Sequence, residues 1–207
     1  MEINKENLPL ILNRLGKETR RVFKDTPVDI WVVGGANLLY SFDFRDMTAD
    51  IDVIKNRSID LKDIALKLEE ELDLPHNWIN DSVMFSDSFS RQLRHYVSSV
   101  KEFNHSLVCH FISPVAITAM KVKALRPEKS DLLDALCVYF EANLTFGYFN
   151  RVYLDLYAED PPTVFKEIVD SLAEYNGHID AREVKRLWNL ATSSGVNLLE
   201  MLSDLCT

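Results

Sequence analysis

Cysteine and glycine are scarce in this sequence. Its 207 residues include three cysteines and six glycines. The cysteines, Cys109, Cys137 and Cys206, are odd in number and show no CxxC spacing. We therefore expect reduced thiols rather than a disulfide framework or a zinc site. Because glycine is rare, the adjacent pair Gly34 and Gly35 stands out as a candidate for a special backbone conformation.

Long apolar runs and an excess of positive charge are also missing. No apolar run approaches the roughly 20 residues that cross a bilayer, and Met1 to Lys5 lack the basic and then apolar layout of a signal peptide. We therefore expect a cytosolic protein with no membrane partner. A formal net charge of −9 argues against sequence-independent binding to duplex nucleic acid, which depends on a basic surface.

Apolar periodicity predicts an α+β fold with an α/β-type core in the first half of the chain. An amphipathic helix that begins at Leu8 precedes a strand over Asp29–Val33, and the glycine pair ends that strand. The other predicted elements of the core are a helix at 36–41, a strand at 48–54, a helix at 60–72 and a hairpin of strands at 96–103 and 106–112. Residues 1–112 form this predicted core.

From Ser113 onward the pattern is helical. Ser113 and Pro114 suit an N-cap and a first-turn proline. The predicted helices cover 114–125, 130–143, 162–175, 181–192 and 196–205. Because no linker rich in glycine, serine or proline separates the two halves, we expect residues 113–207 to be a helical region of the same body and not a tethered module.

Two short motifs after the first predicted strand indicate phosphate chemistry. Gly34 and Gly35 stand between a strand and a helix, where backbone N–H groups can approach phosphate oxygens without a Cβ in the way. Asp50 and Asp52 alternate on a predicted strand, so their side chains share a face roughly 6–7 Å apart. Such carboxylates can bind Mg²⁺, which bridges protein oxygens to phosphates. Taken singly, the glycine pair is better explained by a tight turn, and carboxylates on a strand often only face water.

Together these residues resemble the nucleotidyltransferases of the DNA polymerase beta-like superfamily, whose signature is a Gly-Gly or Gly-Ser turn, about a dozen residues, and Asp-x-Asp. The sequence from Gly34 to Asp52 is similar to a bacterial branch that includes abortive-infection nucleotidyltransferase toxins. The resemblance implies a mixed sheet flanked by helices, with Asp50 and Asp52 as catalytic ligands of Mg²⁺ or Mn²⁺. The nucleotide-binding residues that it implies here are Gly34, Gly35, Asn37, Arg45 and Thr48.

A second block has a spacing similar to that branch. Lys121, Arg126 and Asp134 follow the order K-x4-R-x7-D. The resemblance implies that all three are catalytic and that Lys121 also binds nucleotide. Lysine and arginine on an early helical face can bind polyphosphate, the arginine through its bidentate fork. The alternative is a solvated basic helix end in which Asp134 is a salt-bridge partner.

One departure from the family concerns a third carboxylate, which many active members carry on a later strand. The run 106–112 contains no acidic residue. His110, Glu102 or Asp134 are possible substitutes, and the sequence does not choose among them. The nearby His105, Cys109 and His110 make a poor metal site, because a second pair of ligands is missing.

We therefore expect a Mg²⁺-dependent nucleotidyltransferase that transfers a nucleoside monophosphate from a nucleoside triphosphate to an acceptor hydroxyl on an RNA, a protein or a small molecule. The main alternative is a catalytically inactive nucleotidyltransferase fold that binds a nucleotide or a protein partner, as in a toxin–antitoxin pair. A third interpretation is an unrelated α+β interaction protein in which the two motifs are coincidental. The acceptor and the preferred base are not readable from the sequence.

Overall fold

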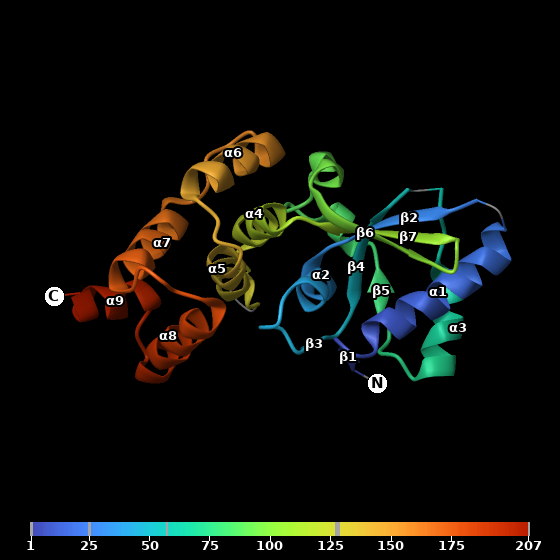
Figure 1. Cartoon of the computed structure of the whole chain (residues 1–207), viewed down its shortest axis with the longest axis horizontal. Coiled ribbons are helices and arrows are strands. Elements are labelled where there is room, and N and C mark those ends of the chain that lie inside the picture. The colour runs from blue at the N-terminus through green and yellow to red at the C-terminus, as the bar shows by residue number, and fades with distance from the viewer. Residues whose placement is uncertain (1, 25, 57, 127–128, 207) are drawn as a thin grey trace. The chain divides into compact units, whose positions relative to one another are not determined.

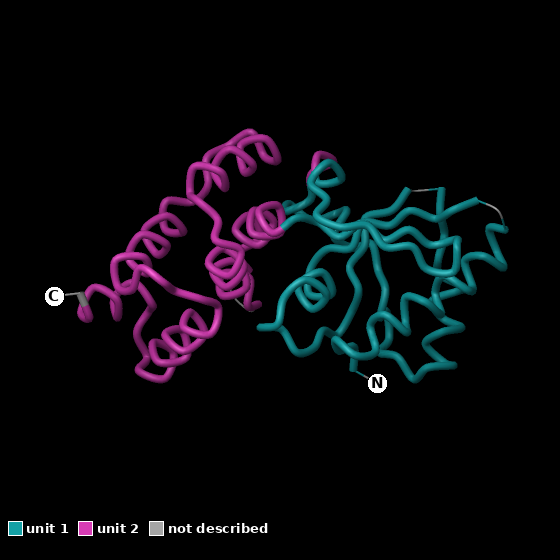
Figure 2. The backbone as a smooth tube through the Cα atoms, viewed as in Figure 1, with its two compact units in different colours: residues 1–89, 93–113 teal, residues 90–92, 114–207 magenta. Residues whose placement is uncertain are grey.

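The computed structural model describes residues 2–206 apart from 25, 57 and 127–128 (Figure 1). Two compact units make up the chain, residues 1–89 with 93–113 and residues 90–92 with 114–207 (Figure 2). The elements up to residue 113 are β1 (Ile3–Asn4), α1 (Leu8–Phe23), β2 (Val28–Val32), α2 (Gly34–Ser41), β3 (Met47–Thr48), β4 (Ile51–Lys55), α3 (Lys62–Leu72), β5 (Ile79–Asn80), η1 (Ser82–Phe85), η2 (Arg91–His95), β6 (Val97–Phe103) and β7 (Leu107–Ile112).

Within the described residues, a mixed five-stranded sheet in the order β5-β4-β2-β7-β6 forms the centre of the first unit. The central strand β2 runs antiparallel to β4 and parallel to β7, so that Val32 is paired with Val53 on one side and with Phe111 on the other. β5 is parallel to β4, and β6 is antiparallel to β7. The α+β class predicted from the sequence is confirmed.

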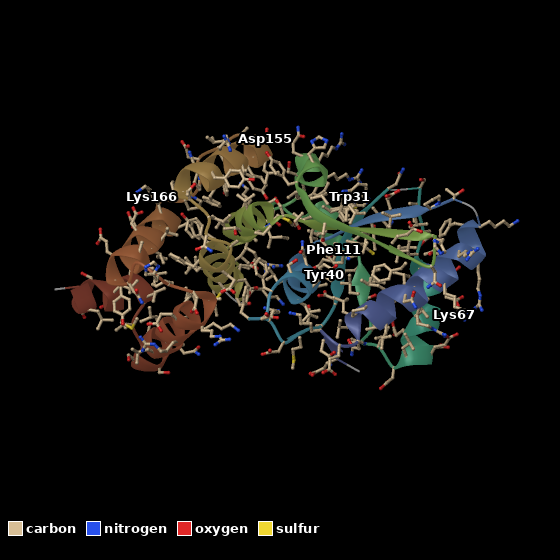
Figure 3. The ribbon with its side chains drawn as sticks, in the orientation of Figure 1. Trp31, Tyr40, Lys67, Phe111, Asp155 and Lys166 are labelled. Carbon is tan, nitrogen blue, oxygen red and sulfur yellow. The ribbon has the colours of Figure 1, made fainter. Side chains whose placement is uncertain are left out.

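One face of this sheet packs against α1 and α3 (Figure 1). The buried residues of α1 recur at helical spacing, as the amphipathic pattern predicts: Leu8, Ile11, Leu12 and Leu15. Gly16 allows α1 to approach β6 closely, because a Cβ at this position would lie 2.6 Å from the carbonyl oxygen of Phe103. Tyr40 of α2 stacks on Phe111 of β7 with ring centroids 3.7 Å apart (Figure 3).

A buried carboxylate links α1 to α3. Glu18 accepts a hydrogen bond from Lys67 of α3 at 2.7 Å (Figure 3) and another from Arg21 at 2.6 Å. The hydrogen bond from Lys67 holds the pKa of Glu18 below its ordinary value, and Arg21 adds to this effect, while burial opposes it. Both carboxylate oxygens are therefore satisfied, which makes burial of this charge tolerable.

The structure divides one predicted strand. β3 ends at Thr48 and β4 begins at Ile51, so Asp50 lies in the connection and not within the strand expected over 48–54. The physical reason is that Thr48 pairs with Ile3 of β1, whereas Ile51 pairs with Ile79 of β5. The residues of the one predicted strand therefore belong to two strands, β3 paired with β1 and β4 paired with β5.

The predicted hairpin is confirmed as β6 and β7. Three residues, 104–106, connect the strands, and the first two, Asn104 and His105, both have positive φ, as the central residues of a type I′ turn do.

Helices make up the second unit (Figure 2). They are α4 (Pro114–Ala124), α5 (Asp131–Glu141), α6 (Phe146–Tyr157), α7 (Thr163–Tyr175), α8 (Ala181–Ser194) and α9 (Leu198–Cys206). α6 was not among the predicted helices, although Thr145 caps it by accepting a hydrogen bond from the Tyr148 N–H. Asp180 caps α8, since its side chain accepts a hydrogen bond from the Glu183 N–H. Among the described residues, no helix combines the length and apolar character that crossing a membrane requires.

Candidate functional site

β2 leads into a glycine turn at the N-terminus of α2. Gly34 has a φ of +62°, a conformation that is strained for a residue with a Cβ. Val33 is the N-cap residue, and its apolar side chain cannot cap the first N–H groups of the helix. A helix N-terminus whose N–H groups lack a capping side chain favours a bound anion.

Side chains from the next loop and strand lie directly against the two glycines. A Cβ on Gly34 would lie 2.5 Å from Oδ2 of Asp52. A Cβ on Gly35 would overlap the hydroxyl of Thr48 and lie 3.5 Å from Nη2 of Arg45. The structure therefore brings these five motif residues together in the first unit, and it explains why both positions are glycine.

The connection between α2 and β4 contains the short strand β3 with Thr48, and β1 holds it in place. Thr48 is buried and paired with Ile3, and its hydroxyl donates to the carbonyl oxygen of Asp50 at 3.1 Å. In the same connection, Arg45 Nε donates to the carbonyl oxygen of Met47 at 3.0 Å. These contacts fix the backbone that precedes the carboxylates.

Asn37 lies inside the unit, and only 1% of it is exposed. Its amide nitrogen donates to the carbonyl oxygens of Val32 at 3.0 Å and Ile112 at 2.9 Å, and its oxygen accepts from Ser41. Asn37 therefore ties α2 to the ends of β2 and β7. Its predicted contact with nucleotide stays a prediction.

The two carboxylates of the Asp-x-Asp motif lie at the N-terminal end of β4, where Asp50 precedes the strand and Asp52 is its second residue. Asn80 of β5 is opposite Asp52 in the parallel register, and its Nδ2 donates to Oδ2 of Asp50 at 3.2 Å. Both carboxylates are partly exposed. The described residues contain no cluster of three or more His, Cys, Asp or Glu that could hold a metal ion by itself. The two oxygen donors fit Mg²⁺ in the form that keeps waters and takes substrate phosphates as its remaining ligands.

Comparisons of the chain with protein-family models, curated proteins and solved structures found no significant match. Function is therefore inferred from the residues and their geometry.

The second block of motif residues forms a charge network in the second unit. Lys121 Nζ lies 2.8 Å from Oδ1 of Asp131 and 3.0 Å from Oδ2 of Asp134. Arg126 donates to Asp131 through Nε at 2.7 Å and through Nη2 at 3.1 Å. Burial raises the pKa of Asp131, but the hydrogen bonds from Arg126 and Lys121 outweigh it and lower the pKa to about 2.

These contacts match the salt-bridge interpretation of the second block, with Asp131 as the main acceptor. Asp131 is fully buried and Lys121 is 14% exposed, whereas 53% of the Arg126 side chain is exposed. The first group of motif residues belongs to one compact unit and Lys121, Arg126 and Asp134 belong to the other.

Two of the possible substitutes for a third carboxylate lie away from the Asp pair. His110 is opposite Trp31, which is opposite Ile54, so two strand spacings and two residues separate it from Asp52, roughly 10 Å or more. His110 Nε2 lies 2.7 Å from Oδ1 of Asp29, and its ring stacks on Trp31. Glu102, near the hairpin turn, contacts His105 instead.

The histidine and cysteine residues of the hairpin do not converge. Successive residues of a strand face opposite sides, and Cys109 lies on the buried core face, whereas His110 pairs with Asp29. Cys109 and Cys137 are free thiols, and burial raises the pKa of both, that of Cys137 to about 12. The Cys206 side chain lies outside the described part of the chain.

Sequence reasoning missed two residues that the structure places at these sites, Asn80 and Asp131. Asn80 was one polar residue in an irregular segment, and only its pairing with β4 brings it to Asp50. Asp131 did carry a local signal, because it precedes Asp134 by one helical turn and both can face Lys121.

Proposed function

We propose that this protein is a Mg²⁺-dependent nucleotidyltransferase. The observation that supports it most is the position of Asp52 and Thr48 directly against Gly34 and Gly35, at the N-terminus of α2. Phosphate oxygens would accept hydrogen bonds from the N–H groups of this turn, next to the carboxylates that would hold the metal ion.

In the proposed reaction, an acceptor hydroxyl oxygen bonds to the α-phosphorus of a nucleoside triphosphate. The bond between the α-phosphorus and the bridging oxygen breaks, pyrophosphate leaves, and the hydroxyl proton passes to solvent or to a base on the acceptor. Bound Mg²⁺ would neutralise charge on the phosphates. Asp50 and Asp52 would bind the ion, and Gly34 and Gly35 would hold the β- and γ-phosphates in line.

Lys121 and Arg126 have a secondary place in this proposal. Arg126 contacts Asp131 through Nε and Nη2, and 53% of its side chain is exposed. An anion can therefore approach its guanidinium from solvent. Lys121 would have to weaken its contacts with two buried aspartates, so we expect its effect on nucleotide binding to be smaller than that of Asp52.

A second candidate function is a nucleotide-binding or protein-binding module without turnover. The contacts of Lys121 with Asp131 and Asp134 favour it, because a lysine held in this way contributes little charge to a phosphate site. The absence of an acidic residue from the β7 sequence favours it as well. A protein partner of the toxin–antitoxin kind belongs to this second candidate.

Calorimetric and thermal-shift titrations with ATP, GTP, CTP and UTP, each with and without Mg²⁺, test the metal site. We expect at least one triphosphate to bind in a Mg²⁺-dependent manner, and the double variant Asp50→Asn/Asp52→Asn to lose the Mg²⁺-dependent part of that binding, because it removes both proposed ligands. The double variant Glu70→Gln/Asp87→Asn controls for the lost charge, since both residues are exposed elsewhere in the same unit.

Equal binding by the wild type and the Asp50→Asn/Asp52→Asn variant would contradict the site. Mg²⁺-dependent binding without release of pyrophosphate, tested with RNA, protein and small-molecule acceptors, would select the binding-module candidate.

A further inference from the structure

The segment that carries Asn80 is anchored in the core of the first unit. Trp78 is fully buried, and its Nε1 donates to the carbonyl oxygen of Ala65 in α3 at 3.0 Å. The backbone N–H of Ile51 donates to the carbonyl oxygen of Trp78 at 2.6 Å. Together these contacts set the register of β5 against β4, so that Asn80 lies opposite Asp52.

The orientation of the Asn80 amide is also determined. Its Oδ1 accepts hydrogen bonds from the backbone N–H and the hydroxyl of Ser82. Because the oxygen faces these two donors, the NH₂ group faces Asp50, where it donates to Oδ2 at 3.2 Å. A flipped amide would place its NH₂ group against the N–H of Ser82 and would lose both sets of hydrogen bonds.

Asp50 needs such a partner more than Asp52 does. Asp52 lies within β4, where the ladders with β2 and β5 fix its backbone, whereas Asp50 precedes the strand. The Thr48 hydroxyl holds the carbonyl oxygen of Asp50, and the Asn80 amide holds its side chain. In parallel register, the Asn80 side chain points to the same face of the sheet as that of Asp52.

From this geometry we infer that Asn80 is a positioning residue, which orients the Asp50 carboxylate beside Asp52 for binding a divalent cation. The inference rests on the proposed metal-binding role of the two aspartates. As a neutral donor, the Asn80 amide engages one oxygen of Asp50 and adds no charge of its own. The lone pairs of the carboxylate that this hydrogen bond does not use would be available to the cation.

The test measures binding of Mn²⁺ alone, because the spin-resonance signal of the free ion reports its concentration directly. We expect Asn80→Ala to bind Mn²⁺ about tenfold more weakly than the wild type, the loss that is typical when a partner of a metal ligand is removed. The matched control is Asn56→Ala, which also removes an asparagine side chain that accepts from the N–H two residues ahead, but away from Asp50.

A second variant separates positioning from charge. Asn80→Asp keeps the shape of the side chain and its contacts with Ser82, but it replaces the donor to Asp50 with a third carboxylate. We expect its melting temperature to fall without metal and to rise more on addition of Mn²⁺ than that of the wild type, because the cation relieves the repulsion. No gain of metal-dependent stability would contradict the position of this side chain beside the metal site, on which the inference depends.

The outcomes distinguish this inference from the proposed function. If the wild type and Asp50→Asn/Asp52→Asn bind Mn²⁺ equally, the proposed metal site itself fails. If that pair differs while Asn80→Ala binds as the wild type does, the metal site stands and the inference is overturned. Should Asn80→Ala fail to fold, Ser82→Ala decides: it keeps Asn80 but loosens its amide, and unchanged Mn²⁺ affinity would overturn the inference.

Discussion

Gly34 and Gly195 both have a left-handed backbone conformation, but their surroundings differ. Gly195 ends α8 with a φ of +70° and has open space where a Cβ would be, whereas a Cβ on Gly34 would meet Asp52. We expect Gly195→Ala to lower the free energy of unfolding by about 1 kcal/mol, the backbone cost alone. Gly34→Ala adds a steric conflict and should cost about 2–4 kcal/mol.

Urea unfolding of the two glycine variants and the wild type measures this difference. Equal losses would mean that the Asp52 carboxylate moves aside freely, and that it is not held against the turn.

At the residue scale, the sequence was sufficient to predict a site residue where the pattern that marks the residue is local. Gly34, Gly35 and Asp52 were predicted because an adjacent glycine pair and alternating carboxylates are short-range patterns, and the structure brings them together. Asn80 could not be predicted, because β5 has only two residues and Asn80 is paired with Asp52, which lies 28 residues earlier in the sequence. The strength of the Asp131 contacts also depends on burial, which spacing does not reveal.

At the scale of elements, the charge network joins the end of α4 to the beginning of α5, and its strength depends on pH. The pKa of Asp131 is about 2 in the folded protein against 3.8 for an ordinary aspartate. Its stabilising effect is therefore complete above about pH 4 and disappears as the pH falls towards 2. This contribution of Asp131 to the free energy of unfolding amounts to about 2 kcal/mol.

We expect the difference in unfolding free energy between the wild type and Asp131→Asn to be largest above pH 4 and to shrink between pH 4 and pH 2. Urea unfolding at a series of pH values measures it, and Asp160→Asn, at an exposed position, controls for the lost charge. A difference that stays constant down to pH 2 would contradict the coupling of Asp131 to Lys121 and Arg126.

The predictability of elements followed their length and regularity. The long helices α1 and α8 were predicted from their helical period, because each repeats its pattern over several turns. β1, β3 and β5 have two residues each, too few for a period, and they form only because longer-range pairing recruits them. α6 was missed because its aromatic residues are also favoured in strands.

At the scale of the whole molecule, the first unit has a core of its own. Its main cluster of buried residues extends from Ile3 to Phe111 and includes side chains of α1, α3 and the sheet. We therefore expect a fragment of residues 1–113 to fold and to unfold cooperatively in urea, as a domain with its own core does. A fragment with the circular dichroism of an unstructured chain would show that this core depends on residues beyond 113.

The strand order has a consequence for protein synthesis. β2 is central in the sheet, yet Val28 to Val32 pair on one side with β7, which begins only at Leu107. At ordinary translation rates, β2 is synthesised about 4–15 s before β7. During that interval the apolar strand β2 has one unpaired edge. A stalled or truncated nascent chain therefore presents a binding segment for chaperones until β7 pairs with β2.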